Sequence, residues 1–171
     1  MAALYHGTLS RNQDVITNEG IQPRIGDFTK NAYGSNAEGL LPAVFMADGE
    51  GLERVVHAMV AATMDEVTEE DFEEWDIGPD QHLNDAMFCK YGVIYVIEAS
   101  DAFALTGSPK EGTTEPLQAE DGDWYSLAAV KPVRSLTGDD LRSFLEEKGI
   151  LPSDINDFVD EDRHYTVPSL R

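Results

Sequence analysis

The strongest structural signal in the sequence is a short apolar run, Gly92–Glu98, which is rich in β-branched residues. A run of this length and composition is typical of a buried β-strand. The pattern predicts further strands at 3–6, 42–47 and 124–130, and helices at 12–18, 52–63, 69–75 and 137–148. Short strands with helices between them, and no sustained alternation of strand and long helix, favour an α+β fold over a doubly wound sheet.

The length and charge of the chain limit what it can be. Its 171 residues suit one domain. Twelve Lys and Arg against 33 Asp and Glu give a formal net charge of −21, so we expect no binding to a nucleic-acid backbone and none to an anionic membrane. No apolar stretch approaches the ~20 residues of a membrane span, and the N-terminus lacks the pattern of a signal peptide.

The single cysteine, Cys89, excludes an internal disulfide and fits a reducing compartment. We therefore expect a cytoplasmic, intracellular protein, with the cytoplasm of an infected host as one option. The thiol itself is expected to pack as a small hydrophobic group rather than act as a nucleophile.

The acidic residues gather in two segments. We interpret about 63–90 as an acidic insertion and about 137–171 as an acidic C-terminal extension of a single domain, 1–171. Ten acids fall between Asp65 and Asp85 with no Lys or Arg among them. A solvated surface explains such a segment, and a basic protein partner is the alternative explanation.

Several common motifs are missing from the sequence. It contains neither a Walker loop nor a G-x-G-x-x-G fingerprint. Three of the histidines, His57, His82 and His164, are too far apart in sequence to indicate a zinc site, which needs three or four convergent ligands. We therefore expect no metal.

Four short motifs occur in a suggestive order. They are His6-Gly7-Thr8 at the end of the first expected strand, Gly20-Ile21 after the first helix, Phe45-Met46-Ala47-Asp48 between a strand and a helix, and Asp123-Trp124 heading a strand that leaves through Val130-Lys131-Pro132. This order resembles the ADP-ribosyltransferase fold, in its His-Tyr-Glu branch of poly(ADP-ribose) polymerases and diphtheria-toxin-like enzymes. The resemblance covers roughly 3–61 and 92–136. It implies a pair of packed, mostly antiparallel sheets with flanking helices, and NAD as the substrate.

The resemblance also implies roles for individual residues. His6 is implied to hold the adenosine ribose, with Gly7 and Thr8 after it, and is expected with Asp123 as a catalytic residue. The Gly7 backbone is implied to pair with the nicotinamide amide. Phe45 is implied to stack on the nicotinamide. Arg24, which follows the Gly20 turn, is expected to bind the NAD pyrophosphate.

Asp123 is implied to be the catalytic acid, because a carboxylate near the ribose stabilises the positive charge that develops when nicotinamide leaves. Two positions depart from the family pattern. The family tyrosine is Phe45 here, and the family glutamate is Asp123, which is one methylene shorter. Glu120 or Asp121 is an alternative acid. These departures argue against formation of poly(ADP-ribose) chains.

The resemblance therefore implies a mono-ADP-ribosyltransferase that modifies a macromolecule, expected to be a protein with a basic surface. A phage anti-defence effector such as an anti-CRISPR is one interpretation. The alternative is a non-catalytic acidic decoy that inhibits a nucleic-acid-binding protein. A third hypothesis is an RNA 2′-phosphotransferase, which would need a cluster of arginines, or an NAD glycohydrolase on the same fold.

Overall fold

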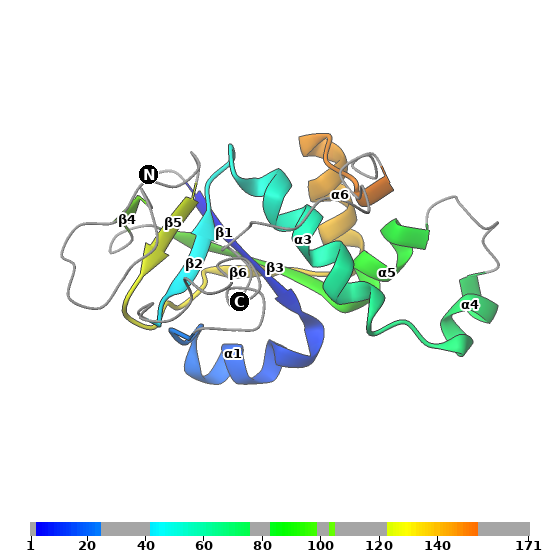
Figure 1. Ribbon diagram of the computed structural model, residues 1–171, viewed down its shortest axis with the longest axis horizontal. Coiled ribbons are helices and arrows are strands. Elements are labelled where there is room, and N and C mark those ends of the chain that lie inside the picture. The colour runs from blue at the N-terminus through cyan, green and yellow to red at the C-terminus, as the bar shows by residue number, and fades with distance from the viewer. Residues whose placement is uncertain (1–2, 25–41, 76–82, 99–102, 105–122, 154–171) are drawn as a thin grey trace, which may run out of the picture.

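The computed structural model describes residues 3–24, 42–75, 83–98, 103–104 and 123–153 (Figure 1). Their strands form one antiparallel sheet in the order β4-β5-β2-β1-β3-β6. The strands are β1 (Ala3–Leu9), β2 (Val44–Ala47), β3 (Gly92–Glu98), β4 (Phe103–Ala104), β5 (Asp123–Ser126) and β6 (Arg134–Leu136). Helices combined with an antiparallel sheet confirm the predicted α+β class.

Helices lie on both faces of this sheet (Figure 1). A short 3₁₀ turn, η1 (Ser10–Asn12), leads into α1 (Gln13–Glu19) on one face. The opposite face carries α3 (Leu52–Met64), α5 (Leu83–Tyr91) and α6 (Gly138–Lys148), and α4 (Glu69–Trp75) lies beyond the end of α3. Within the described ranges, no helix has both the length and the apolar character that a bilayer crossing requires.

The side chains of β3 alternate between the two faces, as the strand periodicity requires. Ile94 and Val96 pack in the cluster under α3, α5 and α6. Val93, Tyr95 and Ile97 pack on the other side, where Ile16 of α1 covers them. Burial on both faces explains why the sequence of β3 is a nearly continuous apolar run.

The predicted pair of packed sheets is not found among the described strands, which form a single sheet. Strands β1 and β3 pair along seven positions, but β1 and β2 pair at only one, where Tyr5 lies opposite Ala47. We call this junction the seam. It joins the β4-β5-β2 half of the sheet to the β1-β3-β6 half, and helices rather than a second sheet cover the two faces.

Part of the segment expected as an acidic extension belongs to the core. Helix α6 buries Leu141, Phe144 and Leu145 in the same cluster as Tyr5, and the Phe144 ring lies 5.4 Å from the Tyr5 ring between centroids. The residues after 153 lie outside the described part of the chain. The acidic side chains of α6 project from a helix that the core needs.

Candidate functional site

A cavity of about 260 Å³ lies where β1, α1 and the segment after α1 meet. The residues that line it are His6, Thr8, Asn12, Val15, Ile16, Gly20, Ile21, Gln22 and Arg24. Three of the residues proposed from the sequence, His6, Thr8 and Arg24, are thereby brought together. The volume is a little below the ~300–1,000 Å³ typical of ligand sites, so the described walls suit part of a dinucleotide rather than all of it.

His6 is buried, and its hydrogen bond determines its chemistry. The ring nitrogen Nδ1 lies 2.7 Å from the backbone oxygen of Phe45. Because a carbonyl can only accept, Nδ1 donates, and the neutral ring keeps Nε2 as an acceptor. Burial lowers the pKa of His6 from 6.5 to about 4, the bond to Phe45 opposes this, and the positive charge of Arg24 lowers it further. At neutral pH the cavity therefore contains an uncharged imidazole with a free acceptor.

Thr8 lies two residues further along β1, so its side chain faces the same side of the sheet as His6. Its Oγ1 accepts a hydrogen bond of 2.9 Å from Asn12 Nδ2. The Thr8 hydroxyl is consequently free to donate its own proton elsewhere. Asn12 was not predicted as a site residue, although its position four residues after Thr8, at the entry to a helix, is a signal that could have suggested it.

The Gly20–Arg24 segment forms the rim of the cavity. Gly20 ends α1 with a φ of 78°, and its amide donates to Ile16 at 2.8 Å. Ile21 then pairs with Val130, and the Arg24 amide donates to Ala43 at 3.3 Å. The Gly20-Ile21 motif thus ties the rim to the segment after β5, and Arg24 to the residue before β2.

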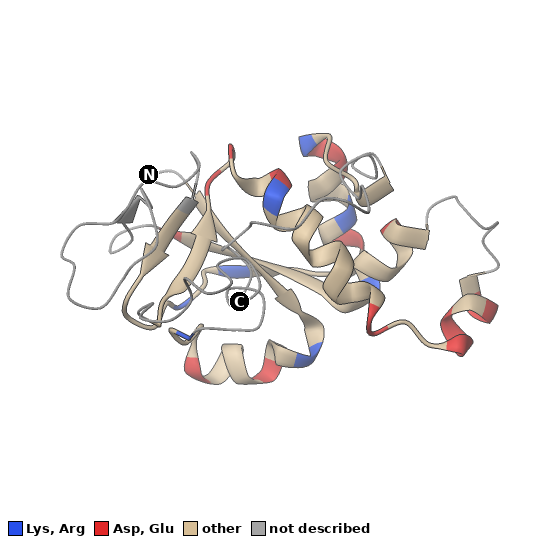
Figure 2. Cartoon of the chain, viewed as in Figure 1, with Lys and Arg blue, Asp and Glu red and all other residues tan. Residues whose placement is uncertain are grey.

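The cavity differs in charge from the rest of the molecule. Arg24 is the only charged side chain among the described residues that line it, although the chain carries 33 acids. Figure 2 shows Asp and Glu along α4; α1 also carries Asp14 and Glu19, which are exposed and do not line the cavity. A cavity whose described lining has one cation and no carboxylate, in a protein of net charge −21, suits an anionic ligand.

Phe45 meets His6 through its backbone and not through its ring. The ring is 1% exposed and packs with Ala43 and Tyr125, and Phe45 is not among the residues that line the cavity. Gly7 is also outside the lining, and it packs against α3: a Cβ there would lie 2.2 Å from Met59 Sδ. The glycine therefore has a packing reason in addition to the proposed backbone role.

Asp123 is the first residue of β5, and it pairs with Ala47 across the sheet. Ala47 is the residue that meets Tyr5 at the seam, so these three positions form one row across three strands. The structure describes the backbone of Asp123 and its register. The alternative acids, Glu120 and Asp121, lie outside the described residues.

The residue after Asp123 makes a contact that the sequence did not predict. Trp124 donates from Nε1 to Asp48 Oδ2 at 2.9 Å. Asp48 also accepts from the amides of Glu50 and Gly51 through Oδ1, so its carboxylate links β5 to the turn before α3. The aspartate of the Phe45–Asp48 motif is therefore a structural residue that anchors Trp124.

The described residues offer neither a cluster of metal ligands nor a reactive thiol. Across the described ranges, no three side chains of His, Cys, Asp or Glu converge as metal ligands would. Cys89 is half-buried, and burial raises the pKa of its thiol to about 11. At neutral pH this thiol is protonated and weakly nucleophilic.

The described cavity thus contains a neutral hydrogen-bond acceptor, an oriented hydroxyl group and one cation, around an apolar floor formed by Ile16 and Ile21. These groups can bind a polar ligand that carries both hydroxyls and a negative charge. No family model, no curated protein and no solved structure matches this chain.

Proposed function

We propose that this protein is a mono-ADP-ribosyltransferase that binds NAD at the cavity beside the seam and transfers ADP-ribose to a protein with a basic surface. The observation that carries the proposal is the state of His6. Its imidazole is neutral, fixed by the Phe45 carbonyl at 2.7 Å, and lines a cavity with a cation and no described carboxylate. This combination suits a ribose next to a phosphate.

The hydrogen bonds of NAD match the groups on this side of the sheet. A ribose hydroxyl can donate to His6 Nε2, and the Thr8 hydroxyl can donate to a ribose or phosphate oxygen. The Arg24 guanidinium can bind the pyrophosphate with two parallel hydrogen bonds. We assign the described cavity to the adenosine side of NAD, in accordance with the role expected for His6.

The proposed reaction balances without another reagent. The bond between the ribose carbon and the nicotinamide nitrogen breaks, and nicotinamide leaves as a neutral molecule with the bonding electrons. A nucleophile of the target bonds to the same carbon and loses its proton. A carboxylate near the ribose stabilises the positive charge that develops on the sugar. We assign this role to Asp123, with Glu120 and Asp121 as the alternatives in the preceding segment.

The charge of the protein supports a basic target. Helix α4 exposes Glu69, Glu70, Glu73 and Glu74, and a net charge of −21 attracts a cationic surface over long range. Since the described cavity lining contains no acid, bound NAD meets no carboxylate there while the acidic outer surface recognises the target.

The test measures nicotinamide release and the transfer of label from labelled NAD, with and without a bacterial lysate as the source of acceptors. We expect both signals from the wild-type protein. His6→Asn keeps a donor for the Phe45 carbonyl but removes the Nε2 acceptor, so it should weaken NAD binding about tenfold. Asp123→Asn should lower turnover by about 100-fold or more while leaving NAD binding nearly intact.

Asp140→Asn is the matched control for Asp123, because it removes an exposed acid of α6 and should leave turnover unchanged. If folded wild-type protein releases no nicotinamide and transfers no label, the proposal fails. Release without transfer would indicate an NAD glycohydrolase. Salt-sensitive binding to a basic protein that survives His6→Ala and Asp123→Ala, with no NAD consumed, would indicate the acidic decoy.

A further inference from the structure

We infer that Lys131, which lies at the rim and outside the lining of the cavity, supplies a second cation to its ligand, and that Arg24 and Lys131 together bind the diphosphate of a dinucleotide. No motif or pattern assigned a role to this lysine beyond its place after a strand. The inference rests on the proposed function where it names NAD as the dinucleotide. The anion site itself rests on the geometry of the Gly20–Arg24 rim and of the segment after β5.

Backbone pairing places Lys131 at the cavity rim. The Ile21 amide donates to the Val130 oxygen at 2.8 Å, and the Val130 amide donates back to Ile21 at 3.0 Å. In an antiparallel pair of this kind, the residue before Ile21 lies opposite the residue after Val130. Gly20, which lines the cavity, is therefore the neighbour of Lys131.

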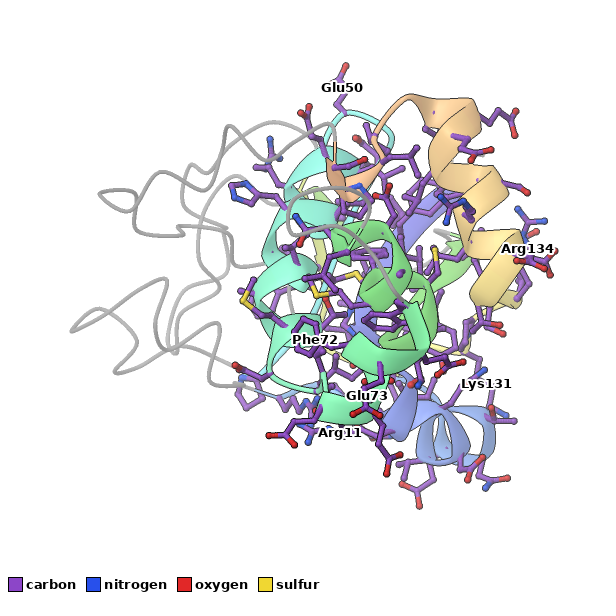
Figure 3. The ribbon with its side chains drawn as sticks, turned by 90° about the vertical axis from the view of Figure 1, so that its right-hand side faces the viewer. Arg11, Glu50, Phe72, Glu73, Lys131 and Arg134 are labelled. Carbon is purple, nitrogen blue, oxygen red and sulfur yellow. The ribbon has the colours of Figure 1, made fainter. Side chains whose placement is uncertain are left out.

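The side chain of Lys131 also lies close to Gly20. An ideal Cβ on Gly20 would lie 3.5 Å from Lys131 Cγ and 2.9 Å from the Val130 oxygen. The absence of a side chain at Gly20 thus leaves room for the lysine stem to lie against the rim. Figure 3 shows Lys131 beside α1, the helix that Gly20 ends. The flexible end of the stem can bring its ammonium group over the opening.

Within the described ranges, the two cations have no ion-pair partner. Among the described residues, neither Arg24 nor Lys131 takes part in an ion pair, whereas bases elsewhere do. The pairs found are Arg11 with Glu66, Lys90 with Asp71 and Glu74, and Arg142 with Glu146. In a chain with 33 acids and 12 bases, two cations beside one cavity that have no ion pair with any described residue provide a local site for a ligand with more than one negative charge.

A diphosphate fits this arrangement better than a single phosphate. A guanidinium binds phosphate oxygens through two parallel bonds, and an ammonium acts as a mobile point charge. Arg24 can therefore hold one phosphate in a fixed orientation while Lys131 neutralises the next. A nucleoside without phosphates would gain nothing from Lys131.

Calorimetric titration at low ionic strength tests this, with three probes: NAD, inorganic pyrophosphate and adenosine, which has no phosphate and no charge. Lys131→Ala should weaken the binding of NAD and of pyrophosphate about tenfold and leave the binding of adenosine unchanged. Lys131→Arg retains the charge and should stay within about twofold of the wild type. The matched control is Arg134→Ala: Arg134 is also exposed and has no ion pair among the described residues, but its backbone in β6 lies opposite Val96 of β3 and not at the rim.

The outcomes separate the inference from the proposed function. If His6→Asn weakens NAD binding but Lys131→Ala behaves like Arg134→Ala, the inference is overturned and the proposed function stands. If pyrophosphate binds in a Lys131-dependent way but NAD does not bind, the anion site stands and the proposed function falls. If the wild-type protein binds neither NAD nor pyrophosphate, both are overturned.

Discussion

His6 Nδ1 donates to the carbonyl oxygen of Phe45 at 2.7 Å, and the two residues belong to strands that pair at one position only. The imidazole thus supplies, from a side chain, a bond between β1 and β2 beyond the Tyr5–Ala47 pair. The same bond selects the tautomer that leaves Nε2 as an acceptor. One hydrogen bond therefore links the two strands at the seam and also leaves His6 Nε2 able to accept a hydrogen bond in the cavity.

The buried state of His6 predicts a loss of stability in mild acid. Its pKa is lowered from 6.5 to about 4 by burial, so between these values the unfolded chain binds a proton that the folded protein excludes. The contribution of neutral His6 to the free energy of unfolding is therefore complete above about pH 6.5. It is lost as the pH drops toward 4, which lowers the free energy of unfolding by up to about 3 kcal/mol. Urea denaturation at pH 7 and pH 4.5 measures this change.

The His6→Asn variant separates this effect from the titration of carboxylates. It has no imidazole, so its free energy of unfolding should change less between the two pH values than that of the wild type. Parallel losses in the two proteins would contradict the assignment to His6.

Gly7 should not tolerate a methyl group. In Gly7→Ala the new Cβ would lie 2.2 Å from Met59 Sδ and 2.8 Å from Val55 Cγ1, and both side chains are buried. We expect a loss of about 1–3 kcal/mol in the free energy of unfolding, measured by urea denaturation. Gly49→Ala, where nothing lies within 4 Å, should change it by less than about 0.5 kcal/mol.

A double variant tests whether the clash with Met59 is the cause. In Gly7→Ala with Met59→Ala, the loss should be smaller than the sum of the two single losses, because the atom nearest the new methyl group is gone. Additive losses would show that Gly7 matters for another reason.

Asp71 is expected to hold α4 against α5. Its buried carboxylate accepts hydrogen bonds from Lys90 and from Tyr91 Oη, the latter at 2.5 Å, and from the Thr68 amide at 2.9 Å. The bonds from Lys90 and Tyr91 hold its pKa well below the usual range, so its stabilising effect is present at neutral pH and is lost in strong acid. Asp71→Asn should lower the urea midpoint clearly more than Glu74→Gln, whose exposed carboxylate lies 3.7 Å from the same Lys90. Equal midpoints would contradict this role.

Two tyrosines should respond differently to loss of the hydroxyl. The Tyr95 hydroxyl is buried, and within the described part of the chain it has no hydrogen-bond partner; burial raises its pKa to about 12, so it stays protonated. Tyr95→Phe should therefore leave the free energy of unfolding unchanged or raise it by up to about 1 kcal/mol. Tyr91→Phe removes a donor to Asp71 and should lower it. Thermal melting of both variants provides the comparison, and a clear loss in Tyr95→Phe would show that its hydroxyl is paired.

The elements that could be predicted are those whose signals are local. The β-branched run coincides with β3 (Gly92–Glu98), and Thr137 and Gly149 flank α6 as expected for its two caps. Helix α5 was not predicted, because it buries a charged residue on the side that meets the core: Asp85 is held there by the Ser153 amide and hydroxyl, at 3.0 and 2.8 Å. A contact between residues 68 positions apart leaves no trace in the local pattern.

The sequence indicated several residues that line the cavity, but it did not indicate which way the Phe45 side chain faces. His6, Thr8 and Arg24 do line one cavity, because a strand end, a helix and a glycine turn bring them together. The burial of the Phe45 ring with Tyr125, on the other hand, depends on which face of β2 meets β5. The sequence of a four-residue strand that is buried on both faces does not indicate which side chain faces the ligand.

The seam also bears on how this sheet can bend. With one paired position between β1 and β2, a change in the angle between the two halves strains far fewer backbone hydrogen bonds than a change within the seven-position β1–β3 ladder. The rim opposes such a change, because Ile21 pairs with Val130 after β5 and Arg24 donates to Ala43 before β2. The cavity therefore lies between two links that join the halves of the sheet, the His6–Phe45 hydrogen bond and the rim, and both halves position its walls.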